Sequence, residues 1–198
     1  MRLPKTAHTS PPWRIHEIAD DFQLEDVWAL PTPGGPDDFA RLVRQLANDG
    51  DTQISSPVPR LLFAVRRKLG ALLGLDKPGT GVGARVPTLR DRLPADLREG
   101  PRGPDLPTGP FTSVYQTHDE WAAEIANRTV QAVRHIAWVP DGAGGYRGQM
   151  AVLVKPNGLL GALYMAGIKP FRYLGVYPAI LRAIGREWQA GAGERSAR

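Results

Sequence analysis

Few residues of this sequence have the types and spacing that catalysis or metal binding requires. The four histidines, His8, His16, His118 and His135, do not share the spacing of a helical metal motif, and the pattern H-E-x-x-H is absent. A metal site needs three or four converging ligands. The chain has no cysteine and no G-x-S-x-G, which excludes thiolate chemistry and argues against a serine hydrolase. We therefore expect no metal and no cofactor, and assign no catalytic residue.

The most informative candidate is an arginine on an apolar strand face. Residues 121–127 and 130–139 alternate with period two and are joined by a tight turn near 127–129. This turn pairs Ala123 with Arg134 and Trp121 with Ile136. We expect that face, which also carries Trp138, to be buried. The opposite face, expected to be exposed, carries Glu124, Gln131, Val133 and His135.

A charge on a buried face needs a partner or a watery cavity. One interpretation is that Arg134 anchors the carboxylate or phosphate of a bound ligand. The alternatives are that it pairs with Glu25 or Asp26, or that its head extends to the rim.

Other side chains are candidates to line the same ligand site. They are Trp138, Tyr115, Tyr164, Tyr177 and Arg172. The tyrosines could offer hydroxyls to a cavity, or fill the core with one hydrogen-bonded tip. Arg172 could close the cavity mouth, or lie solvated at its rim.

The first half of the chain is predicted to be mainly helical. We expect a flexible arm at 1–12, strands at 13–19 and within 22–31, and a helix in 36–50 whose stripe is Phe39, Leu42, Val43 and Leu46. A second helix is expected at 55–74. A Pro/Gly-rich loop follows at 77–110, with one or two helical turns in 88–100. Its PGTGVG, residues 78–83, follows a helix instead of a strand, so we interpret it as a linker.

The second half is predicted to be a run of strands closed by a helix. Strands are expected at 111–117, 121–127, 129–139, 148–155 and 161–168, with Pro-Asn-Gly (156–158) as a hairpin turn. Their short connections require antiparallel neighbours. A helix follows at roughly 171–189, and a flexible tail at 190–198. This order predicts one α+β domain over 13–189, in which a curved antiparallel sheet of six to seven strands wraps around the last helix.

The net charge of +5 does not by itself indicate a nucleic-acid partner. Residues 60–102 hold ten Lys or Arg against four Asp or Glu, but their only aromatic residue is Phe63. Because nucleic-acid sites usually combine basic and stacking residues, we expect neither nucleic-acid binding nor contact with a membrane surface. No apolar run of about 18 residues and no secretory signal is present, so a cytoplasmic location is expected.

Three segments carry a resemblance to a known family. They are TLRDRLPADLR (88–98), NRTVQAVRHIAWV (127–139) and GALYMAGIKPFRYLGVYPAILRAIG (161–185). Over about residues 22–188 the chain resembles the uncharacterised family "domain of unknown function 2867", which is usually placed in the START-like (SRPBCC) superfamily. The resemblance implies a helix-grip fold and no established activity. Relatives favour His-apolar-Asp-aromatic where this chain has His135, Ile136, Ala137 and Trp138, so the acid is absent here.

Three functions remain open. The first is a non-enzymatic module that binds an apolar or amphipathic small molecule between sheet and helix, as START-like folds imply. The second is a START-like enzyme of cyclase, dehydratase or isomerase type, which would use Glu124 and His135 if the strand faces were reversed. The third is a partner of a short-chain-dehydrogenase-like protein, because relatives are fused to such proteins.

Overall fold

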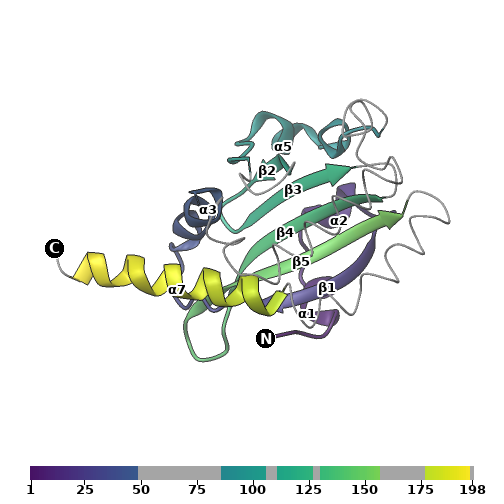
Figure 1. Ribbon diagram of the computed structural model, residues 1–198. Coiled ribbons are helices and arrows are strands. Elements are labelled where there is room, and N and C mark those ends of the chain that lie inside the picture. Colours follow the sequence, from purple (N-terminus) through teal and green to yellow (C-terminus); the bar gives the residue numbers. More distant parts are fainter. Residues whose placement is uncertain (49–85, 106–110, 127–129, 157–176, 197–198) are drawn as a thin grey trace, which may run out of the picture.

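A five-stranded antiparallel sheet is the centre of the fold. The computed structural model describes residues 1–48, 86–105, 111–126, 130–156 and 177–196 (Figure 1). Within these ranges the strand order is β1-β5-β4-β3-β2. The strands are β1 (Gln23–Ala29), β2 (Thr112–Gln116), β3 (Glu120–Ala126), β4 (Val130–Pro140) and β5 (Tyr146–Pro156). The antiparallel α+β prediction is confirmed. The expected strand at 161–168 lies outside the described residues.

The register between β3 and β4 is the predicted one. Ala123 lies opposite Arg134 and Trp121 lies opposite Ile136. β4 then pairs with β5 along its whole length, so that Arg134 lies opposite Val152 and Ile136 opposite Met150. This places Trp121, Arg134 and Met150 on one side of the sheet, and the residues between them on the other.

Both faces of the sheet are covered. The first, here called the α7 face, packs against α3 (Phe39–Asn48) and α7 (Tyr177–Ser196). The second, the α2 face, packs against α1 (Thr6–Thr9), α2 (Ile15–Ile18), the 3-10 helix η2 (Leu89–Arg92) and α5 (Ala95–Glu99). In Figure 1, α7 lies in front of the sheet and α2 behind it.

The prediction that the second face is exposed was therefore wrong. Glu124 and His135 are both 0% exposed, and Gln131 is 2% exposed. The physical reason is that segments expected to be an arm, a strand and a loop fold into short helices over this face. Their apolar residues Trp13, Ile15, Ile18, Leu89, Leu93 and Leu97 form one core with the sheet.

The N-terminal segment departs most from expectation. Residues 1–12 were expected to be flexible, but Ala29 N–H donates to the Met1 carbonyl (2.8 Å) and Leu3 N–H to the Val27 carbonyl (2.9 Å), so this segment continues the sheet beyond β1. The expected strand at 13–19 is wrong as well, because residues Ile15–Ile18 of this segment form helix α2. Ile15 and Ile18 are one helical turn apart and both point into the core.

The remaining helices follow the sequence pattern more closely. α3 buries the predicted stripe of Phe39, Leu42, Val43 and Leu46. η2 and α5 confirm the helical turns expected within 88–100. α7 continues to Ser196, beyond the expected end at 189. The expected helix at 55–74 lies outside the described residues. In the described part of the chain, none of the helices has the length and apolar character needed to cross a membrane.

A glycine in β5 allows α3 to approach the sheet. A Cβ atom at Gly148 would lie 2.7 Å from Leu42 Cδ2 and 2.9 Å from Leu30 Cδ1. We expect Gly148→Ala to lower the free energy of unfolding by about 1–3 kcal/mol, because overpacking displaces core side chains. Urea denaturation measures this change.

Gly35→Ala is the matched control, since its Cβ would meet only Asp38 Oδ2, at 3.8 Å. That substitution should change stability by less than about 1 kcal/mol. Equal stability of the two variants would contradict the close approach at Gly148.

Candidate functional site

Arg134 lies on the α7 face, as the sequence predicts. Its guanidinium carbon lies 4.8 Å from the centre of the Phe111 ring, and its side chain is half-buried. Burial lowers the pKa of Arg134 below its ordinary value, and the electrostatic interaction with Tyr177 partly opposes this. Among the described residues, Arg134 forms no ion pair. Within the described part of the chain, the groups that interact with its charge are therefore aromatic, namely the Phe111 ring and Tyr177.

The alternative pairing of Arg134 with an acid of β1 is not formed. Asp26 lies in the same row of the sheet, but Val152 of β5 stands between them. Two strand spacings amount to about 10 Å. Asp26 instead lies 4.0 Å from the guanidinium of Arg2.

Two further candidates on the α7 face have packing roles. The indole N–H of Trp138 donates to the Gly35 carbonyl (2.9 Å), and its ring lies 6.0 Å from that of Trp188. The Tyr177 ring lies 4.9 Å from the Trp28 ring. Tyr164 and Arg172 lie outside the described residues.

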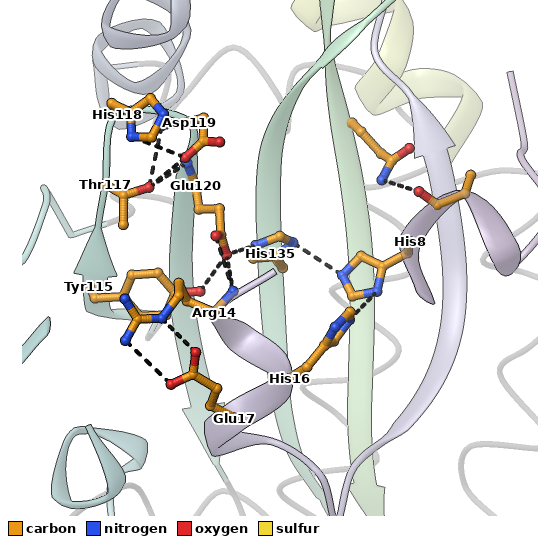
Figure 2. Close-up of polar contacts among 12 residues, drawn as sticks. His8, Arg14, His16, Glu17, Tyr115, Thr117, His118, Asp119, Glu120 and His135 are labelled. Atoms are coloured by element: carbon orange, nitrogen blue, oxygen red, sulfur yellow. Dashed lines mark hydrogen bonds and ion pairs between the residues drawn. The ribbon is translucent and has the colours of Figure 1, made fainter. Parts of the chain in front are cut away.

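Tyr115 does not belong to this group, because it lies on the opposite face. Its hydroxyl donates to Oε2 of Glu120 (2.9 Å), and the whole side chain is buried. The α2 face holds a polar network around this carboxylate (Figure 2).

Glu120 accepts hydrogen bonds from three directions. Besides Tyr115, the backbone N–H of Arg14 donates to both carboxylate oxygens (3.1 and 3.0 Å), and Nε2 of His135 lies 3.0 Å from Oε2. Arg14 immediately precedes α2, so the contact joins this helix to β3. Glu120 is 4% exposed, and an ionised carboxylate can be buried this deeply when several donors replace its hydration.

Three histidines continue the network toward the surface. Nδ1 of His135 lies 3.2 Å from Nε2 of His8, and Nδ1 of His8 lies 3.2 Å from Nε2 of His16. His8 is buried and His16 is half-buried. Figure 2 shows the rings following one another away from Glu120. Within the described ranges, the structure contains no group of three or more His, Cys, Asp or Glu arranged to hold a metal ion. We call His16, His8 and His135 the histidine chain.

The electrostatics of the network favour an ionised acid and neutral outer histidines. Burial alone would raise the pKa of Glu120, but the hydrogen bond and charge of His135, with the Arg14 and Tyr115 bonds, outweigh it and lower that pKa. The pKa of His8 is lowered to about 3, chiefly by burial and then by the neighbouring His135 and His16, while Glu120 opposes the shift. Burial and then the Glu120 charge raise the pKa of Tyr115.

Glu124 fixes a second helix to the same strand. Leu89 N–H donates to both of its oxygens (3.1 and 3.2 Å), the Thr88 hydroxyl donates to Oε1, and the Gln131 amide donates to Oε2 (3.1 Å). Thr88 and Leu89 are the start of η2. Glu120 and Glu124 therefore each fix one covering helical segment to β3 by accepting a backbone N–H at the start of that segment.

The enzymatic hypothesis loses the residues on which it rested. His135 is bonded to Glu120 and His8, whereas Glu124 is bonded to η2 and Gln131. Both residues lie on the α2 face, so they do not line a space between the sheet and α7.

Sequence reasoning missed Glu120, His8 and His16. Glu120 lies just before the strand expected at 121–127, although its period-two relation to Glu124 indicates that it belongs to the same strand face. His8 and His16 have no local signal, because their partners are distant in the sequence. The fourth histidine, His118, lies outside this network, with its side chain 91% exposed.

The fold and site define an α+β protein whose sheet is covered on both faces and contains a buried acid–histidine network on one of them. A family model described as "Protein of unknown function (DUF2867)" matches residues 18–179. The chain therefore belongs to this family. No curated protein and no solved structure matches it.

Replacing the acid at the centre of the network tests its structural importance. Glu120→Gln should lower the free energy of unfolding by about 2–4 kcal/mol, because the amide lacks the charge and places an N–H group against existing donors. Chemical denaturation at pH 7 measures the loss.

Glu17→Gln provides the control. Glu17 is an exposed acid that pairs with Arg14 (2.6 Å), and its loss should cost less than about 1 kcal/mol. If both variants are equally stable, the buried carboxylate does not hold α2.

The depressed pKa of His8 predicts instability in acid. Unfolded His8 takes up a proton below about pH 6.5, whereas folded His8 resists protonation down to about pH 3. The unfolded state then binds more protons, so stability should fall as the pH drops from 6.5, by up to about 1.4 kcal/mol per pH unit. The lowered pKa of Glu120 adds a loss in the same direction at lower pH, where the folded carboxylate is protonated.

Denaturation from pH 8 to pH 4 measures this slope. His8→Phe should flatten it between pH 6.5 and 4.5, and the exposed-site control His118→Gln should leave it unchanged. An unaltered slope in His8→Phe would show that His8 titrates normally.

Proposed function

We propose that this protein is a non-enzymatic binding module for an amphipathic small molecule with an anionic head, and that its sheet and α7 form a helix-grip. The sheet bears a C-terminal helix on one face, which is the arrangement that this fold requires. The observation that carries the proposal is Arg134, a cation on the α7 face that lies over the Phe111 ring and interacts with Tyr177.

The cost of burial supports an anionic ligand. A half-buried guanidinium loses part of its hydration, and the lowered pKa of Arg134 expresses this loss. A carboxylate or phosphate restores the lost interactions, because the fork of N–H groups binds two oxygens at once. The aromatic ring of Phe111 offers the cation only a weaker attraction.

The surroundings of Arg134 support an apolar tail. Phe111 and Val152 pack at the border of the α7-face core and are only partly buried. Ala132 and Ile125, in the next row of the sheet, are also partly buried. A ligand that places its head on Arg134 would cover this apolar surface with its tail.

A pair of probes that differ only in the head tests the proposal. We expect a long-chain fatty acid to bind about 10- to 100-fold more tightly than the alcohol of equal chain length, because the acid alone forms a charge-assisted bond. Arg134→Met should remove this preference while keeping weak binding of both probes. Titration calorimetry measures both affinities, and native mass spectrometry gives the stoichiometry.

Arg44→Met is the control, because Arg44 is exposed on α3 and bonds to the Ala40 carbonyl (3.2 Å). It should keep the preference. Failure of both probes to bind, or a preference that survives Arg134→Met, would contradict the proposal.

A short-chain-dehydrogenase-like partner also stays a prediction. It rests on the resemblance alone and is tested by co-purification with such a protein. A partner that binds Arg134→Met and wild-type protein equally would act at a surface distinct from the ligand site.

A further inference from the structure

Helix α1 is held in place chiefly by a titratable side chain. Its one buried residue is His8, at 1% exposure. Ala7 is partly buried, and its carbonyl accepts a hydrogen bond from the Gln149 amide (3.2 Å). Before α1, Leu3 is bonded to β1, and after it Trp13 and Ile15 are buried in the α2-face core. Residues 4–12 thus form a short flap between two anchored segments.

The directions of the hydrogen bonds in the histidine chain follow from the acid. An ionised Glu120 only accepts, so His135 donates from Nε2. If all three rings are neutral, Nδ1 of His135 then accepts from Nε2 of His8, and Nδ1 of His8 accepts from Nε2 of His16. This leaves Nδ1 of His16, at the outer end, as the single ring nitrogen of the three that neither donates nor accepts a hydrogen bond within the chain.

The chain accommodates one added proton without losing a contact. A proton that binds Nδ1 of His16 is followed by a shift of one hydrogen across each contact, and the positive charge then lies on His135 beside Glu120. Every contact still contains one hydrogen. The ion pair at 3.0 Å favours this arrangement.

A second added proton has no place in the closed chain. It would put two N–H groups opposite each other across one of the 3.2 Å contacts between rings. The contact must then break, and each contact between rings includes His8, the buried residue of α1.

We propose that α1 is a proton-operated flap over the Glu120–His135 pair, which stays closed while the histidine chain holds at most one added proton and opens when the chain takes up a second. Opening exposes the His8, His16 and His135 rings and gives solvent access to the acid. The depressed pKa of His8 is consistent with a closed chain that excludes a second charge.

The other charged groups around the chain do not supply an alternative trigger. From β2 and β3 the chain meets Tyr115 and Glu120. The Arg14 side chain is engaged by Glu17 and by Asp96 of α5 (2.7 Å), which keeps its charge away from the rings. From β5 the neutral Gln149 contacts α1.

Hydrogen exchange of the full chain tests the proposal. The exchange of peptides from residues 4–12 and from β4 is followed by mass spectrometry from pH 8 to pH 5, and corrected for the intrinsic rate at each pH. When the flap is open, the exposed histidine rings titrate near pH 6.5, whereas the closed chain holds at most one added proton. Protection of residues 4–12 should therefore fall by at least about tenfold per pH unit below pH 6.5, while that of β4 changes far less.

Two variants identify the source of the effect. His8→Phe should make protection of residues 4–12 independent of pH, and His118→Gln, which alters only an exposed ring, should behave as wild type. If His8→Phe does not fold, the pH dependence of protection in the wild type and in His118→Gln still tests the proposal. Protection of residues 4–12 that does not change with pH, or that falls in parallel with β4, would overturn the proposal.

Discussion

The α2 face depends on two carboxyl groups buried on one strand. Glu120 and Glu124 are four residues apart on β3, so both point to the same side of the sheet. Each accepts hydrogen bonds from a backbone N–H at the start of a helical segment, α2 in one case and η2 in the other. Removing such a partner leaves a desolvated charge, which is costly. The two acids thereby determine where these short helices lie on the sheet, and apolar packing by Ile15, Ile18 and Leu89 completes the layer.

The two faces of the sheet follow different physical rules. On the α7 face, the described packing is mainly aromatic and aliphatic, and Arg134 and Asp26 are charged exceptions. On the α2 face, polar groups are common but are bonded to one another. A ligand adds most to a fold where a polar group lacks a partner, which is why we propose that a ligand binds at the α7 face. On the α2 face the buried Glu120 carboxylate and the histidine chain are bonded to one another, and we expect this network to respond to protons.

Alternation and periodicity were enough to predict the strands from β2 to β5, the register that pairs Ala123 with Arg134, and the stripe of α3. These depend on neighbours close in sequence. The covering of the second face was not predictable in this way, because Glu120 binds Arg14 from 106 residues away and His8 binds His135 from 127 residues away. Short segments such as α1 and α2 also have too few residues for a periodic pattern. Polar residues on β3 and β4 therefore looked like a solvated face.

The central claim is that His8, His16 and His135 form one hydrogen-bonded chain that ends on an ionised acid. Nitrogen NMR of the histidine-labelled protein tests it most directly, because ring ¹⁵N shifts report which nitrogen carries the hydrogen. The account predicts that at neutral pH the chain histidines have fixed tautomers, and that His8 stays neutral in the folded protein on acidification. Averaged tautomers in the three rings of the histidine chain, with His8 titrating near pH 6.5, would contradict it.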